Sequence, residues 1–417
     1  MKRWGLWFIS SSIAVTSLFT SAWAQTPSTE VEVPVPESAA VAAVLPGFPQ
    51  PPEIKAKSYI LIDTNTGQVL AEKDANALVE PASLTKLMTA YLVFEALQNN
   101  RLKLDQTLQV SARARHMEGS RMFVEENAWV SVEDLLKGMI VQSGNDATIV
   151  LAEGTGGSVE NFVTSMNQKA QALGMTNTTF MNPEGLNVPG HLTTARDLAT
   201  LSMRLMQDFP QEYKYYSIKE FAYSPKPDAL PINQPNRNRL LFIDPSVDGL
   251  KTGHTSTAGY CLISSSSKKF PNMDENRRLL SVLLGAESDN ARTQESQKLL
   301  NWGYQAWVDI QLITANTKVV SSPVWKGAAS EINLGAANHI IVSVPQGMAD
   351  QIRTTASYTE PLLAPLKAGE NVGTIKVTLE TPSGVVELGS YPLVTLEKVE
   401  EAGFFGRMWD SFLLWIK

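Results

Sequence analysis

Residues 81–90 read PASLTKLMTA and form the start of a predicted buried helix. Across this stretch and just beyond it, apolar residues recur at helical spacing: Leu84, Leu87, Met88, Tyr91, Leu92 and Phe94. Ser83 lies in the first turn and Lys86 three residues later, so both side chains share one helix face. A serine hydroxyl becomes a good nucleophile when a neighbouring base takes its proton. The stretch therefore predicts Ser83 as a nucleophile with Lys86 within reach as its base.

A second tripeptide, Ser143-Gly144-Asn145, lies between two predicted helices, over 132–140 and 147–153. Ser131 is placed to cap the first of these helices. On its own, a small polar tripeptide between helices also fits an ordinary turn. Beside a serine and a lysine, however, it supplies one hydroxyl and one amide to the same cleft.

A third tripeptide, Lys251-Thr252-Gly253, falls on a predicted strand, where its glycine leaves space for the backbone of a ligand. The Ser83–Lys86 spacing alone also fits an N-cap serine followed by a solvated lysine. The three motifs in this order resemble the trio of class A β-lactamases and penicillin-binding proteins, and this resemblance implies a serine acyl-transfer site.

Composition limits the other functions that the chain can have. Its 417 residues carry a formal net charge of −7 and no basic stripe, which argues against nucleic acid as a partner. The single cysteine, Cys261, lies in an apolar run and excludes an internal disulfide. No metal site or other cofactor is expected, because the four histidines are far apart in sequence: His116, His191, His254 and His339.

The first 52 residues predict export. Lys2 and Arg3 precede an apolar stretch over 4–19, and Ala22-Trp23-Ala24 matches a cleavage site, so residues 1–24 are interpreted as a signal peptide. Residues 25–52 are rich in Pro and Ala, which predicts a flexible or extended linker. The mature protein is therefore expected outside the cytoplasm.

The rest of the chain divides into three parts according to its pattern of predicted helices, strands and turns. Residues 53–308 contain a hairpin over 57–72, the motif-bearing helices, strands over 259–264 and 279–285, and a closing helix from Arg292 to near Trp307. Residues 309–396 alternate short β-type segments with Pro and Gly turns, which predicts a small all-β domain.

Residues 397–417 end in an apolar, aromatic-rich segment, Phe404 to Lys417, with amphipathic spacing. It is too short to span a bilayer, and its composition favours an anchor in the membrane interface. A terminal helix docked on the protein's own core remains the alternative.

Taken together, the chain resembles the low-molecular-mass penicillin-binding proteins of the penicillin-binding protein 5/6 type, which are serine D-alanyl-D-alanine carboxypeptidases. The resemblance rests on the three motifs and extends through the β domain and the tail. It implies an α+β catalytic domain with an antiparallel sheet flanked by helices. It also implies removal of the terminal D-Ala from peptidoglycan stem pentapeptides, acylation by β-lactam antibiotics, and a location on the periplasmic face of the cytoplasmic (inner) membrane.

The resemblance also assigns roles at the reacting bond. Ser83 is the nucleophile, Lys86 the general base, and Ser143 the relay that passes a proton to the leaving amine. Lys251 is expected as the nearby cation that, with burial, lowers the pKa of Lys86.

Further positions are expected to hold the substrate. Asn145 contacts its peptide, and the backbone N–H groups of Ser83 and His254 form an oxyanion hole. The terminal carboxylate is assigned to Thr252 with Lys251 and to Arg237 or Arg292 nearby, while Gly253 leaves space for the substrate backbone. Glu184, in a turn-rich loop, is interpreted as structural.

Three rival functions remain open from the sequence. A β-lactamase would share the serine and both lysines but need a fast deacylating base. A D,D-endopeptidase would use the same site on cross-linked peptides, and a non-catalytic scaffold would only bind cell-wall peptides. Release of free D-Ala from a pentapeptide favours the carboxypeptidase over all three.

Overall fold

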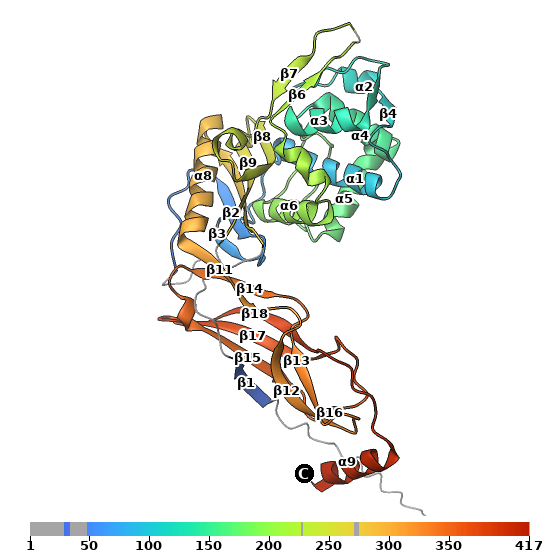
Figure 1. Ribbon diagram of the computed structural model, residues 1–417. Coiled ribbons are helices and arrows are strands. Elements are labelled where there is room, and N and C mark those ends of the chain that lie inside the picture. The colour runs from blue at the N-terminus through green and yellow to red at the C-terminus, as the bar shows by residue number, and fades with distance from the viewer. Residues whose placement is uncertain (1–28, 34–47, 227, 271–274, 417) are drawn as a thin grey trace, which may run out of the picture.

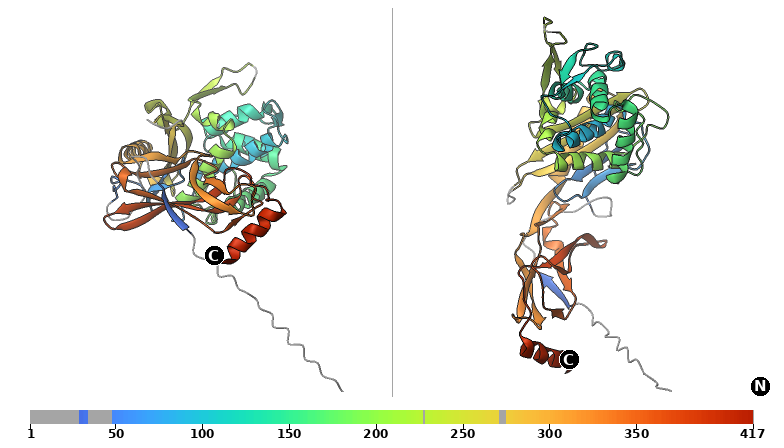
Figure 2. Two further views of the ribbon diagram at one scale, coloured as in Figure 1. Left: turned by 60° about the horizontal axis from the view of Figure 1, so that its bottom comes forward. Right: turned by 90° about the vertical axis from the view of Figure 1, so that its right-hand side faces the viewer.

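The computed structural model describes residues 29–33, 48–226, 228–270 and 275–416. The predicted signal peptide lies outside these residues, as does most of the predicted linker. The described chain is elongated: a mixed α/β body at one end, a β domain below it, and helix α9 at the far end (Figures 1 and 2). This arrangement confirms the predicted α+β fold class.

The α/β body is built on a five-stranded sheet in the order β3-β2-β10-β9-β8, with every neighbouring pair antiparallel. Its strands are β2 (Ser58–Asp63), β3 (Val69–Lys73), β8 (Val247–Thr255), β9 (Gly259–Lys268) and β10 (Arg277–Ala286). The hairpin predicted over 57–72 is present, and the strands predicted over 259–264 and 279–285 lie within β9 and β10.

Side chains alternate between the two faces of this sheet, as strand geometry requires. Ile60 and Ile62 of β2 belong to the core under the helical layer, whereas Leu61 belongs to the core under α8. Figure 1 shows α8 on one side of the sheet and the other large helices opposite. The helices of this body are α1 (Lys86–Gln98), α2 (Ala112–Arg115), α3 (Val132–Val141), α4 (Asn145–Gly156), α5 (Val159–Ala172), α6 (Ala195–Asp208), α7 (Leu240–Ile243) and α8 (Asp289–Ala306).

Helix ends follow their capping residues. Ser131 accepts a hydrogen bond from the Asp134 N–H at the start of α3, as predicted. The closing helix α8 begins at Asp289, three residues before the predicted start, because Ser288 provides its N-cap. Short pieces complete the body: 3₁₀ helices η1 (Ala82–Thr85) and η2 (Glu212–Ser217), and strands β4 (Thr107–Gln109), β5 (Trp129–Ser131), β6 (Glu220–Tyr223) and β7 (Ile232–Pro235).

The β domain contains a seven-stranded sheet in the order β1-β15-β17-β18-β13-β12-β16 and a two-stranded β11–β14 ladder. Its elements are β11 (Trp307–Ile313), β12 (Lys318–Trp325), β13 (Glu331–Gly335), β14 (Ile340–Pro345), η3 (Ala349–Gln351), β15 (Ile352–Tyr358), β16 (Leu362–Leu363), β17 (Asn371–Thr381) and β18 (Gly384–Thr395). Strand β1 (Thr29–Val33), which the sequence did not predict, pairs with β15 from within the predicted linker.

A buried charge cluster joins the two parts of the chain. Arg277, at the start of β10, lies with its Nε atom 2.7 Å from Asp63 Oδ2 and 3.0 Å from Asp309 Oδ1, and all three side chains are fully buried. Its Nη1 donates to the Trp307 carbonyl at 2.6 Å. Burial and the Asp63 charge raise the pKa of Asp309 to about 8. The cluster ties the catalytic sheet to the first strand of the β domain.

Candidate active site

Ser83 is presented by a tight turn at the entrance of α1. Ala82, just before it, has φ +49°, an unusual conformation for a residue with a side chain. On one side, Gly253 of β8 packs so closely that an added Cβ would lie 3.2 Å from the Pro81 carbonyl oxygen. On the other, a Cβ at Gly185 would lie 1.9 Å from the Ala82 carbonyl oxygen. At Gly185, with φ +90°, only glycine fits against the serine turn, whereas a side chain at Gly253 would require its neighbours to shift by a few tenths of an ångström.

Lys86 lies one turn after Ser83 and is only 1% exposed. Its Nζ atom donates to Ser83 Oγ at 3.1 Å, Asn145 Oδ1 at 2.7 Å and the Glu184 carbonyl at 2.5 Å. Burial lowers the pKa of Lys86 to about 7; Glu184 and Asp146 oppose this shift, and Arg237 adds to it. A lysine with such a pKa is partly neutral near pH 7 and can accept the serine proton.

The second motif lies beside this lysine. Asn145 begins α4, and its Nδ2 donates to the Glu118 carbonyl at 2.7 Å while its Oδ1 holds Lys86. Ser143 has φ +64°, is 3% exposed, and its Oγ has no hydrogen-bond partner among the described residues. A buried hydroxyl without a partner is available for a substrate or a reacting proton.

The third motif lies on edge strand β8, as predicted. Lys251 is buried, and its Nζ donates to the Thr252 carbonyl at 3.1 Å. Burial, followed by the charge of Lys86, lowers the pKa of Lys251 well below its usual value. As the sequence predicts, burial is the main cause of the lowered pKa of Lys86; Arg237 adds to it, and the repulsion between Lys86 and Lys251 acts on the pKa of Lys251.

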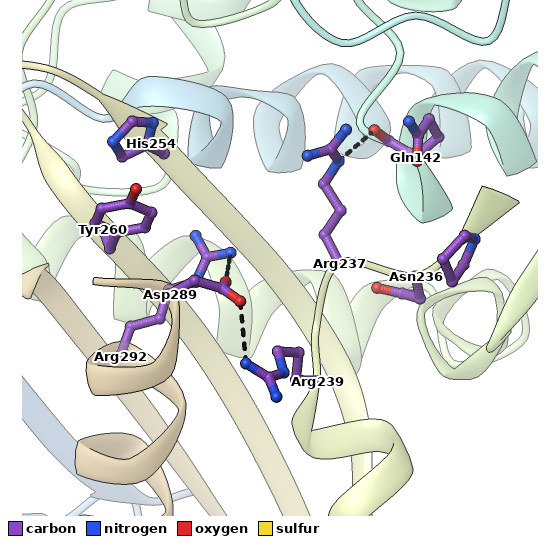
Figure 3. A pocket seen from close by; sticks show the side chains of 9 residues that line it. Gln142, Asn236, Arg237, Arg239, His254, Tyr260, Asp289 and Arg292 are labelled. Carbon is purple, nitrogen blue, oxygen red and sulfur yellow. Dashed lines mark hydrogen bonds and ion pairs between the residues drawn. The ribbon is translucent and has the colours of Figure 1, made fainter.

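A cavity of about 570 Å³ opens beside β8, and three arginines line it (Figure 3). Arg237 Nε donates to the Gln142 carbonyl at 3.2 Å. Arg292 Nη1 instead donates to the Gly253 carbonyl at 3.0 Å, and its Nη2 pairs with Asp289. His254 and Tyr260, with ring centroids 4.0 Å apart, form another wall. The excess of arginines over carboxylates makes this cavity suitable for an anion.

Hydrogen bonds and packing thus bring all three motifs to one site. Lys86 links the first motif to Asn145, and Gly253 packs on the Ser83 turn. Arg292, which the sequence suggested as a contact with the substrate carboxylate, lines this cavity and also holds the backbone of β8 through the Gly253 carbonyl. Among the described residues, no group of three or more His, Cys, Asp or Glu side chains could hold a metal ion.

Two further groups support the site and were not predicted. His191 Nδ1 accepts from the Met181 N–H at 2.8 Å, so its Nε2 donates to Thr85 Oγ1, also 2.8 Å away. Thr85 in turn donates to the Ala82 carbonyl at 2.8 Å. Burial lowers the pKa of His191 to about 4, which keeps the ring neutral in this arrangement.

Asp146 is the second unpredicted group. Its two carboxylate oxygens accept hydrogen bonds from the backbone N–H groups of Met122, Phe123 and Val124. It fixes the loop over 122–124 to the start of α4. No local sequence pattern identifies either His191 or Asp146, because their partners are remote in the chain.

Comparisons with known proteins agree with this geometry. The family model of D-alanyl-D-alanine carboxypeptidase matches residues 47–288, and that of the penicillin-binding protein 5 C-terminal domain matches residues 307–401. The D-alanyl-D-alanine carboxypeptidase DacC of Escherichia coli is 43% identical over 371 residues, covering 87% of this chain and 89% of that protein.

Other relatives extend the match. The D-alanyl-D-alanine carboxypeptidase DacA of Haemophilus influenzae is 37% identical over 372 residues, 88% of this chain and 91% of its own. The crystal structure of penicillin-binding protein 5 from Haemophilus influenzae superposes with a TM-score of 0.76 at 36% identity, covering 84% of this chain and 99% of that one. The chain therefore belongs to the D-alanyl-D-alanine carboxypeptidase family of serine hydrolases and carries the C-terminal domain of penicillin-binding protein 5.

Proposed function

We propose that this carboxypeptidase removes the terminal D-Ala from peptidoglycan stem pentapeptides through an acyl-enzyme on Ser83, and that penicillins acylate the same atom. The observation that carries the proposal is the 3.1 Å hydrogen bond between Lys86 Nζ and Ser83 Oγ in a buried site, where the pKa of Lys86 is lowered to about 7. Neutral Lys86 takes the hydroxyl proton as Oγ attacks the penultimate D-Ala carbonyl.

The remaining motif residues complete the cycle. Ser143, whose hydroxyl is unpartnered, relays the proton to the leaving D-Ala amine. Asn145 positions the substrate peptide, while the backbone N–H groups of Ser83 and His254 stabilise the oxyanion. Water then attacks the acyl-enzyme, and Ser83 regains its proton.

The terminal carboxylate binds at β8 and the arginine-lined cavity. Thr252 offers a hydroxyl there, Lys251 and Arg237 supply positive potential, and Gly253 leaves room for the substrate backbone. Arg292 supports this site by fixing the Gly253 carbonyl, at 3.0 Å from its Nη1 atom.

Thr252→Val should weaken turnover of substrates with a free terminal carboxylate more than turnover of blocked ones. The change removes a hydroxyl at nearly constant shape, and a hydrogen bond to a charged group contributes roughly 1.5–3 kcal/mol, or about one to two decades in kcat/KM. Thr374→Val, on β17 in the β domain, is the matched control and should leave turnover of both substrate types unchanged. Equal losses on free and blocked substrates would refute the carboxylate assignment.

Release of free D-Ala from a soluble pentapeptide, measured with penicillin turnover on the same sample, tests the proposed function. A carboxypeptidase releases D-Ala stoichiometrically, and a β-lactamase turns over penicillin without doing so. A D,D-endopeptidase is the second candidate, since an Escherichia coli protein with that name is 31% identical over 60% of this chain. It would cleave cross-linked peptides and leave the pentapeptide intact, and a scaffold would release nothing.

We also propose that α9 (Phe404–Ile416) binds the membrane surface and that the mature enzyme works on the periplasmic face of the inner membrane. No α9 residue is buried, and Phe405, Trp409 and Trp415 are each more than 60% exposed. Figure 1 places the helix at the end of the chain remote from the catalytic body. No helix of the described residues is long and apolar enough to cross a bilayer. An exposed aromatic helix supports interfacial binding rather than docking on the core.

Truncation before Phe404 should release the protein into the soluble fraction. Each such side chain gains roughly 1.5–3 kcal/mol when fully buried and less at an interface, yet several together suffice. Penicillin acylation and D-Ala release from a soluble peptide should match those of the full-length chain. A truncated protein that unfolds, or that stays on vesicles, would show that the anchor interpretation is wrong.

A further inference from the structure

The loop over 180–186 is fixed against the serine turn, and Glu184 lies within it. Thr89 Oγ1 of α1 donates to the Pro183 carbonyl at 2.7 Å, and the Gly185 N–H donates to Asn182 Oδ1, also at 2.7 Å. Gly185, at φ +90°, packs against the Ala82 carbonyl. The backbone on both sides of Glu184 is therefore held in place, which places this residue reproducibly beside Lys86.

The backbone carbonyl of Glu184 contacts Lys86 directly, and the charge of its side chain acts on the Lys86 amine. Its carbonyl accepts from Lys86 Nζ at 2.5 Å, the shortest of the three hydrogen bonds of that amine. The residue is 6% exposed, and its Oε2 atom is buried without a hydrogen-bond partner in the described part of the chain. A buried carboxyl oxygen without a partner costs free energy unless another interaction compensates for it.

Asp146 is the other acidic group that acts on Lys86, but backbone N–H groups occupy both of its oxygens. The cations around the pair are Arg237 and Lys251 on the Lys86 side and Arg113 on the Glu184 side. Burial raises the pKa of Glu184 and the Lys86 charge lowers it, while Glu184 in turn raises the pKa of Lys86. The two groups therefore titrate as a pair.

We propose that Glu184 is a positioning residue for the acylation step: its carboxylate is the counter-charge that stabilises Lys86 while the amine holds the Ser83 proton. In that step the Oγ–H bond breaks and an Nζ–H bond forms, as Oγ bonds to the substrate carbonyl carbon. Lys86 later returns the proton, by way of Ser143, to the leaving amine, and Glu184 neither gains nor loses one. This inference rests on the proposed function, because it requires Lys86 to be the base.

Glu184→Gln tests the inference through the pH dependence of penicillin acylation. Removing the negative charge favours neutral Lys86, so the acid limb of the acylation rate should move to lower pH. A neighbouring opposite charge shifts a pKa by about 1–3 units, which sets the expected displacement. The plateau rate should fall, because the lysine becomes a weaker base and its cation loses its counter-charge. A merely structural role would lower the rate without displacing the limb.

Three further variants complete the experiment. Glu184→Ala also removes the charge and should displace the limb in the same direction, so the test survives if the glutamine variant fails to fold. Glu184→Asp keeps the charge, so the acid limb of its acylation profile should lie close to that of the parent. Glu126→Gln removes an exposed carboxylate in the turn before β5 and should leave the profile unchanged.

The outcomes separate the two proposals. If the parent enzyme is not acylated on Ser83, the proposed function and this inference both fail. If the parent is acylated normally but the acid limbs of the parent and the Gln and Ala variants coincide, Glu184 does not supply the counter-charge and only the inference is overturned.

Discussion

Replacing Lys86 by arginine should abolish acylation of Ser83 although the positive charge is retained. An arginine does not give up its proton in a protein, so it cannot accept one from the serine hydroxyl. Loss of a general base typically lowers a rate by about 10²–10⁴-fold. The second-order rate of acylation by a fluorescent penicillin measures this loss directly.

The controls for this prediction concern folding and charge. Lys137→Arg makes the same exchange on α3, where Lys137 pairs with Glu133 at 3.0 Å near the surface, and should acylate like the parent. Thermal unfolding shows whether the buried site has accepted the larger guanidinium. A folded Lys86→Arg protein that acylates at nearly the parent rate would show that Lys86 is not the base.

The second large effect is expected on stability, at Arg277. Arg277→Met removes the cation that lies between Asp63 and Asp309 and leaves two carboxyl groups buried beside each other. Breaking a buried pair by removing one partner costs about 3–5 kcal/mol. Urea unfolding should show a free energy of unfolding that is lower by this amount. The β domain and the catalytic body should lose their mutual attachment.

An exposed ion pair provides the comparison for Arg277. Arg353 lies 3.0 Å from Glu380, with both side chains more than 40% exposed. Arg353→Met should lower the free energy of unfolding by about 1 kcal/mol or less, because solvent screens such a pair. If Arg277→Met destabilises the protein no more than this control, the buried cluster does not stabilise the junction.

Local patterns allowed much of the fold to be predicted. The cap at Ser131 acts over three residues and begins the helix that the sequence indicated over 132–140. The meander of β8, β9 and β10 follows from apolar runs separated by turns. Strand β1 was not predicted, because its ladder joins residues 29–33 to β15, more than 300 residues away, and no local signal encodes that pairing.

At the site, too, local relations could be predicted from the sequence and long-range contacts could not. Ser83 in η1 and Lys86 at the start of α1 are three residues apart, so their spacing predicted the contact, and the two other motifs decided its interpretation. The hydrogen bonds from Lys86 to the Glu184 carbonyl, 98 positions away, and from His191 to Thr85, 106 positions away, depend on tertiary folding. Glu184 was therefore interpreted as structural, although it lies beside the proposed base. Arg292, expected at the substrate carboxylate, is largely engaged by Asp289 and the Gly253 carbonyl.

The most direct test of the central claim is to locate the acyl group after brief reaction with penicillin, by intact mass followed by peptide mapping. One penicilloyl group per chain is expected, on Ser83 in the peptide that contains residues 81–90. The same site should be the one protected by an excess of pentapeptide. A label on Ser143 or elsewhere, or no label on the folded protein, would contradict the assignment of Ser83 as the nucleophile.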